Sequence, residues 1–201
     1  MGKKAPRRTA ERIIETTLNL FNRFGEFNVT TSLIANQVGI SPGNLHYHFN
    51  TKEELITVLY INFQNRFENL LKTPPAANFT EVQQHLVALV EGVWDFRFLF
   101  RDLSHCLNKN RHLEREFPKL IRQQSVFFEQ SLRQLCLQGH LNLELERIDD
   151  IAQAMSMLLT HWICEEYMQS PRQALEPEQA TMSQHRVINL ILGQIIPYKA
   201  S

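Results

Sequence analysis

The chain repeats its apolar residues every three or four positions along most of its length. Residues 8–24 illustrate the pattern, because a helix there would carry two adjacent, largely apolar rows: Ile13, Thr17, Leu20 and Phe24, and Ile14, Leu18 and Phe21. A half-buried strand needs alternation with a period of two, and we find no convincing stretch of it and no hairpin turn signal. The pattern predicts an all-α protein.

Turn and helix-capping residues divide this pattern into about nine helices. We expect them at residues 8–24, from Thr30 or Thr31, from Ser41, and at 51–72, 80–98, 100–108, 113–138, 148–169 and 178–196. The first three helices lie within residues 1–53, which we interpret as a small N-terminal domain. The longer helices fill residues 54–201, which we interpret as a second, larger domain.

The two short helices near residue 40 have the spacing of a helix-turn-helix. Ala35 is small enough for two crossing helices to come close, Gly39 can adopt the positive φ of a tight turn, and Leu45 fills the angle between the helices. Ser41 is a favoured N-cap and Pro42 is favoured in the first helical position. The second helix of the pair is therefore expected to begin at a well-defined point, with Leu45 and Phe49 facing inward.

With those two residues inward, the start of this helix presents polar and aromatic side chains to the outside. In a major groove, Asn44 can bind an adenine edge with two hydrogen bonds, and His46 and Tyr47 can reach bases or phosphates. Thr30 or Thr31 and Lys52 begin neighbouring helices, where they can hold phosphates. The expected DNA-binding residues are Thr30, Thr31, Ser41, Pro42, Gly43, Asn44, His46, Tyr47 and Lys52. The alternative is an ordinary surface corner between two helices, with aromatic residues lying along it.

Charge changes this picture only modestly. The 201 residues carry no net formal charge, but residues 1–72 hold nine Lys or Arg and six Asp or Glu, a difference of +3. A basic arm of Lys3, Lys4, Arg7 and Arg8 precedes the first helix. It either adds phosphate or minor-groove contacts or is simply a solvated terminus.

The segment Arg12–Ile56, RIIETTLNLFNRFGEFNVTTSLIANQVGISPGNLHYHFNTKEELI, resembles the DNA-binding region of TetR/AcrR-type transcriptional regulators. Two positions depart from the family pattern: His46 stands where Tyr is usual, and Thr31 where an apolar residue is frequent. The first departure bears on which operator is bound. The resemblance implies a homodimer on double-stranded DNA with a palindromic operator, released by a small-molecule effector bound in the larger domain.

The larger domain offers candidates for dimer and effector contacts. Its last two long helices are apolar on broad faces, which favours a four-helix interface between two copies. The expected interface residues are Ile151, Met155, Leu158, Trp162, Val187, Ile188, Ile191 and Ile195. The alternative is that both helices lie in one monomeric core. The expected contacts to a largely apolar effector are Trp94, Phe98, Arg101, His105, Phe128 and Trp162, although aromatic residues at helical spacing also occur simply as core.

Other functions find little support. The three cysteines Cys106, Cys136 and Cys164 lack the spacing of a zinc site, so we interpret them as reduced thiols of a cytoplasmic, nucleoid-associated protein without cofactor or metal. No apolar run is long enough for a membrane span. No phosphate-binding loop, dinucleotide fingerprint or HExxH pattern indicates an enzyme. A second hypothesis remains open, a DNA-bound structural or nucleoid-associated adaptor of the same fold that acts through a protein partner.

Overall fold

A computed structural model describes residues 6–169, 171 and 180–200 of the chain. Within these residues the regular structure is helical, apart from one isolated antiparallel bridge between Leu141 and Lys199. The described helices are α1 (Pro6–Phe24), α2 (Thr31–Val38), α3 (Pro42–His48), α4 (Lys52–Leu71), α5 (Phe79–Asp95), α6 (Arg97–Arg101), α7 (Leu103–Lys109), α8 (Arg111–Leu137), α9 (Leu145–Gln169) and α10 (Ala180–Leu192). Two 3-10 turns, η1 (Glu26–Asn28) and η3 (Ile196–Tyr198), complete them. The all-α prediction is confirmed.

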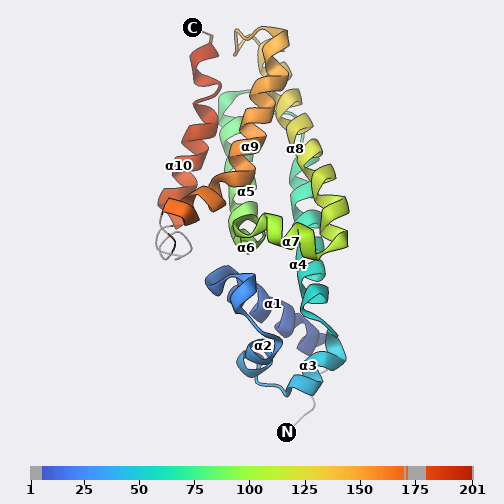
Figure 1. Cartoon of the computed structure of the whole chain (residues 1–201). Coiled ribbons are helices and arrows are strands. Elements are labelled where there is room, and N and C mark those ends of the chain that lie inside the picture. Colours follow the sequence, from blue (N-terminus) through green and yellow to red (C-terminus); the bar gives the residue numbers. More distant parts are fainter. Residues whose placement is uncertain (1–5, 170, 172–179, 201) are drawn as a thin grey trace.

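The helices form a head and a body (Figure 1). Helices α1, α2 and α3 gather at one end, and α4 runs from this head into the body. There α5, α8, α9 and α10 extend away from the head, while the short α6 and α7 lie across the end of the body that faces α1. The predicted domain boundary at residues 53 and 54 falls at the start of α4, so this helix is shared between head and body.

The head folds as its sequence pattern indicates. Ala35 and Leu45 are buried between α2 and α3, and Gly39 adopts a left-handed conformation with φ of 75°. The backbone amides of Gly39 and Ile40 close the end of α2 by donating to Asn36 and Ala35 carbonyls. The guanidinium of Arg12 donates to the carbonyl of Val38 at 2.7 Å and so ties α1 to the same turn.

The prediction of one helix at residues 100–108 is wrong in detail. Two short helices, α6 and α7, replace it, with irregular backbone at Phe96 and Asp102. Phe96, Phe98, Leu99 and Phe100 are all buried, and a straight helix cannot direct so many nearly consecutive side chains into one core. The chain therefore breaks its helix twice within a few residues.

Gly39 provides a test of the turn. An L-residue is disfavoured in the left-handed region, so Gly39→Ala should lower the free energy of unfolding by about 1 kcal/mol although open space surrounds the position. Gly43→Ala is the matched control, because Gly43 lies in α3 with equally open space and no positive φ. We expect it to leave the stability unchanged or raise it. Urea denaturation compares the two variants, and equal stabilities would contradict the assigned turn.

Candidate nucleic-acid interface

Helix α3 begins with the N-cap that its sequence predicts. The Ser41 hydroxyl accepts a hydrogen bond from the Asn44 amide at 3.1 Å, and Pro42 takes the first helical position. Leu45 and Phe49 are buried under the helix. These contacts fix both the start of α3 and its rotation about its own axis.

The opposite face of α3 is open to solvent. Tyr47 has 80% of its surface exposed, which is unusual for so large an aromatic residue. The residues of α3 and its cap that are exposed are Ser41, Pro42, Gly43, Asn44, His46 and Tyr47. Amide, imidazole and phenol groups on one exposed helical face have the hydrogen-bonding capacity to contact base edges and phosphates.

Helix α2 adds its own N-terminus to this surface. The Thr30 hydroxyl accepts from the Leu33 amide at 3.2 Å, and both Thr30 and Thr31 are exposed. Unpaired amides at a helix N-terminus favour a phosphate. Both threonines are exposed at this helix N-terminus, and their contact with a phosphate stays a prediction.

Lys52 lies differently from what the sequence analysis expects. Its ammonium donates to the Glu26 and Val29 carbonyls at 2.9 and 3.1 Å and lies 2.7 Å from the Glu26 carboxylate. The side chain is 23% exposed and is held by the link between α1 and α2. In this position Lys52 stabilises the head, and its phosphate contact stays a prediction.

Glu26 connects this cluster to the body. Its carboxylate is nearly buried, at 5% exposure, and one oxygen lies 3.4 Å from the Nε2 atom of His105 in α7.

Burial raises the pKa of nearby Asp102, although Arg101 acts in the opposite direction. Burial also raises the pKa of Cys106 to about 12, which makes this thiol unreactive at neutral pH.

Asn22 forms a second polar connection between head and body. Its side-chain amide donates to the Asp95 carbonyl at 2.7 Å, and its oxygen accepts from the Phe98 amide at 3.1 Å. These backbone groups lie at the break between α5 and α6, where α6 has no capping side chain of its own. Asn22 supplies that cap from α1.

Sequence reasoning missed Glu26, Asn22 and also Asn110, whose amide joins α4 to α8. Asn110 accepts from the first amides of α8 and donates to the Thr57 hydroxyl at 2.7 Å. Only Asn110 carried a local signal, because it directly precedes a helix. Asn22 binds backbone groups 73 and 76 residues away, and the Glu26 carboxylate faces the side chains of Lys52 and His105, so neither had a local signal.

The six expected effector contacts do not surround one cavity. The Trp94 and Trp162 rings stack with centroids 6.0 Å apart, and Phe98 packs on Phe21 of the head. Arg101 and His105 lie at the junction of head and body, where the Arg101 guanidinium donates to the Tyr167 hydroxyl at 2.7 Å. Phe128 lines a small enclosed cavity among α5, α8 and α9. The six residues therefore separate into core, junction and cavity wall.

The expected dimer residues also differ in position. All except Leu158 are buried in the core of the single chain: Ile151, Met155, Trp162, Val187, Ile188, Ile191 and Ile195. Helix α10 is not apolar on every side, since Arg186 and Asn189 are exposed beside Leu190. Buried side chains have little surface left for a second copy, so these seven residues do not form an interface in this arrangement.

Larger grooves open on the body, including one of about 530 Å³ on α10. Another, of about 500 Å³, lies between α4 and α8, and a further one, of about 720 Å³, lies among α7, α8 and α9.

In the part of the chain that the structure describes, no three His, Cys, Asp or Glu side chains come together to hold a metal ion. Within the same residues, no helix is both long and apolar enough to cross a membrane.

Most of the basic N-terminal arm lies outside the part of the chain that the structure describes. Lys3 and Lys4 fall outside the described residues, and the exposed Arg8 begins the described side chains at this end.

Two family models match the chain. Residues 13–59 match the model described as bacterial regulatory proteins of the tetR family, and residues 62–198 match one described as TetR, bacterial transcriptional repressor. No match was found among curated proteins.

Solved structures share the fold. A TetR-family transcriptional regulator from Marinobacter aquaeolei VT8 is 23% identical with a TM-score of 0.83, over 98% of this chain and 92% of that one. The ketosteroid transcriptional regulator KstR2 of Mycobacterium tuberculosis is 19% identical with a TM-score of 0.65, over 96% and 97%. A regulator from Aquifex aeolicus VF5 is 18% identical with a TM-score of 0.60, over 92% and 98%.

The role of Lys52 can be measured through stability and salt dependence together. Lys52→Gln leaves the buried Glu26 carboxylate without its cation, so the free energy of unfolding should fall by about 1–3 kcal/mol. If Lys52 makes no phosphate contact, the slope of log affinity against log salt for bound DNA should stay unchanged. Lys109→Gln, an exposed lysine of α7, serves as the control for loss of one charge. A slope reduced by about one, with stability intact, would show that Lys52 contacts a phosphate and is not needed to hold the head.

Proposed function

Because the chain belongs to the TetR family of bacterial transcriptional regulators, we propose that it acts as a homodimeric repressor on a palindromic operator. A small-molecule effector would release it. The observation that carries this proposal is the open face of α3, where Asn44, His46 and Tyr47 stand exposed on a helix that is rigidly capped and buried on its other side. A regulator of this kind works where the bacterial chromosome is, in the cytoplasm.

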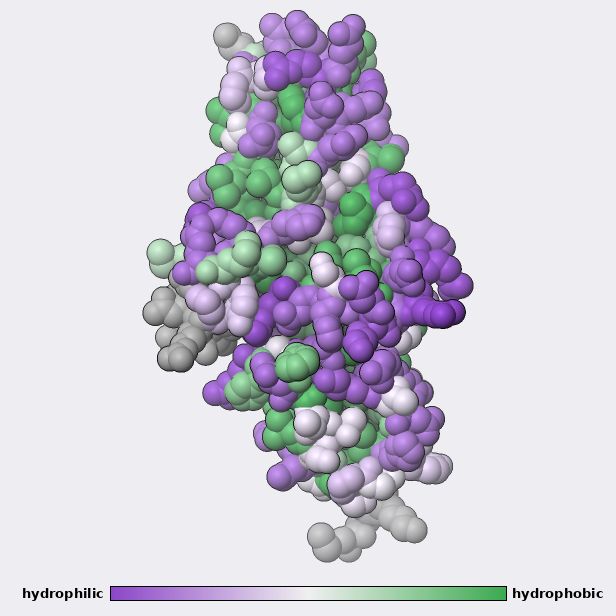
Figure 2. Space-filling view, in the orientation of Figure 1, coloured by the Kyte–Doolittle hydropathy of each residue, from purple (hydrophilic) through white to green (hydrophobic). Residues whose placement is uncertain are grey.

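The proposed dimer uses the exposed faces of α9 and α10. Met157 of α9 and Met182 and Leu190 of α10 are 64%, 78% and 45% exposed. On the face shown in Figure 2, apolar side chains are visible over the body among polar ones. A two-fold axis through such a face would present two α3 helices to half-sites about one helical turn apart or somewhat more.

Effector release is supported by the way in which α4 and α1 join head to body. A ligand that prefers a body conformation with a different separation of the two heads shifts the population away from the DNA-bound form. Proteins of similar fold give this idea context: SmeT has been solved with triclosan, and NalD is described as a secondary repressor of a multidrug efflux pump.

The DNA-binding surface is tested with fragments selected from the source genome by the purified protein. Asn44→Ala and Tyr47→Ala should each lower affinity for a selected fragment by about tenfold or more, because each removes a base or phosphate contact. Asn65→Ala is the control, since Asn65 is an exposed asparagine on α4, outside the head. Unchanged affinity in both α3 variants would refute the docking model. Many scattered genomic sites with a co-purifying protein would favour the adaptor function instead.

The dimer face has a separate test. Leu190→Glu places a charge in the proposed interface and should convert the dimer to a monomer at micromolar concentration while helical content is retained. Leu137→Glu is the matched control, because Leu137 is 81% exposed at the end of α8. Sedimentation velocity measures the mass of each species. A Leu190→Glu protein that remains dimeric would show that the interface lies elsewhere.

A further inference from the structure

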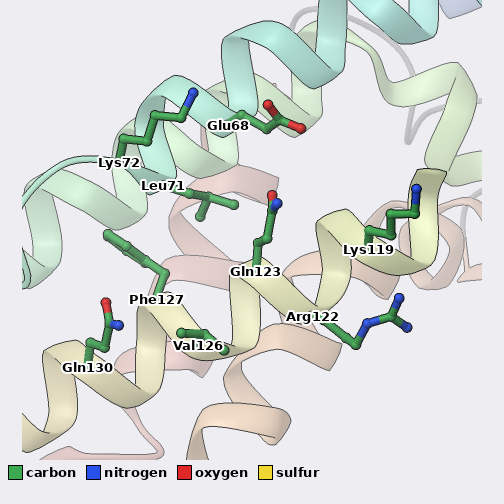
Figure 3. A pocket seen from close by; sticks show the side chains of 9 residues that line it. All are labelled: Glu68, Leu71, Lys72, Lys119, Arg122, Gln123, Val126, Phe127 and Gln130. Carbon is green, nitrogen blue, oxygen red and sulfur yellow. The ribbon is translucent and has the colours of Figure 1, made fainter.

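The groove between α4 and α8 combines an apolar floor with a charged rim. It is lined by Glu68, Leu71, Lys72, Lys119, Arg122, Gln123, Val126, Phe127 and Gln130 and holds about 500 Å³, a volume typical of small-molecule sites. Leu71 and Gln123 point into the gap between the two helices, while Lys72 and Lys119 stand at its rim (Figure 3). None of the six residues expected to contact an effector lines this groove.

The charges of this lining are predominantly positive. The lining holds three cationic residues, Lys72, Lys119 and Arg122, and one carboxylate, that of Glu68, a formal difference of +2. The Arg122 side chain extends away from α4 (Figure 3), so Lys72 and Lys119 are the cations nearer the gap. Lys119 is partly neutralised, because its ammonium lies 2.9 Å from the Glu116 carboxylate. Among the described residues, the structure gives no ion pair to Lys72 or Arg122.

DNA does not account for these cations. Helix α4 has 20 residues, so its two ends are about 30 Å apart. The head adjoins the first end (Figure 1), whereas Glu68 lies in the last turn and Lys72 directly follows it. Duplex held by α3 therefore leaves the cations of the groove free for another anion.

Phe127 separates the groove from the enclosed cavity behind it. That cavity has walls from α5, α8 and α9, including His85, Phe128 and Met155, and holds only about 10 Å³, room for about one water molecule. The Nδ1 atom of His85 is buried there without a hydrogen-bond partner in the described structure. Since Phe127 lines both spaces, its side chain sets how deep the groove extends.

We propose that this groove binds an amphipathic anion, a molecule with an acidic head and a linear apolar tail. The acidic group of the ligand pairs with Lys72 and is also attracted by the net positive charge of the rim. The apolar tail of the ligand lies over Leu71 and Val126 toward Phe127. The inference rests on the proposed function, because it names the chemical class of the effector. It has its own readout, ligand binding in the absence of DNA.

The chemistry is tested by calorimetry with three probes of equal tail length: decanoate, decan-1-ol and decyltrimethylammonium. We expect decanoate to bind most tightly, the alcohol about three- to fivefold more weakly, and the cation not measurably. Decanoate that binds no better than the cation would overturn the proposal, as would the absence of binding by all three.

The location is tested by variants. Gln123→Trp fills the groove from an exposed position and should abolish decanoate binding without disturbing the core. Lys72→Gln should weaken decanoate binding about three- to fivefold, while Lys109→Gln on α7 should leave it unchanged. Phe127→Leu should favour dodecanoate over decanoate, because the wall recedes. Full decanoate affinity in Gln123→Trp would place the ligand elsewhere.

The same samples are also assayed for binding to a selected genomic fragment without any probe. If the wild-type protein without a probe does not bind the fragment, the proposed function is contradicted, whereas the proposal that the groove binds an amphipathic anion is not. Decanoate binding that leaves DNA affinity unchanged would establish the site and overturn its assignment as the effector site.

Discussion

The orientation of the DNA-binding face depends on the contact between the end of α1 and the break between α5 and α6. Phe21 and Phe98 supply its apolar part, with ring centroids 5.2 Å apart. Asn22 supplies the cap that α6 lacks, and removing it would leave two backbone groups unpaired at a cost of about 1–3 kcal/mol. A purely apolar contact can slide, but hydrogen bonds of fixed direction hold the head in one position on the body.

Glu26 extends this constraint in two directions. Its carboxylate binds Lys52 at the start of α4 and faces His105 in α7, so one buried charge joins the head, the shared helix and the body. Next to it, Gly25 has a φ of 81°, and a Cβ there would lie 2.9 Å from the Arg101 guanidinium. Arg101 in turn packs its guanidinium over the Tyr167 ring of α9. Arg101 thus connects α9, through α6, to the turn that leads into α2. An effector can alter DNA binding at a distance only if packed contacts of this kind join its site to the head.

Helix α4 gives the second route between the two parts. Its first turn is capped by Thr51 and held by Lys52, its second turn is joined to the start of α8 through Thr57 and Asn110, and its last turn forms one wall of the charged groove. A ligand in that groove would contact the same helix whose other end adjoins the recognition surface. Helix α4 thus connects the head directly to the groove proposed as the effector site.

Local rules made the head predictable. Ser41, Pro42 and Gly39 act through their own backbone and their immediate neighbours, so the start of α3 and the turn before it follow from short-range chemistry. Helix periodicity similarly gave most long helices within a few residues. The sequence alone could not show that α5 would break at Phe96, because that break depends on how many aromatic residues one core must accept.

Side-chain direction was harder to predict. Lys52 turns inward because a buried carboxylate 26 residues earlier is brought beside it. The apolar residues of α9 and α10 indicated burial correctly, but periodicity does not distinguish a core within one chain from an interface between two. Reasoning from local packing therefore predicted correctly which side chains of α3 are exposed, while their contacts to DNA stay a prediction. It failed for side-chain contacts that depend on distant residues.

Hydroxyl-radical footprinting of the wild-type protein on a selected genomic fragment is the most direct measurement of the central claim. Two α3 helices presented by one dimer predict two protected half-sites related by inverted symmetry, on one face of the duplex and about one helical turn or somewhat more apart. A single unsymmetrical protected region, or protection that spreads along the DNA without a boundary, would contradict the account.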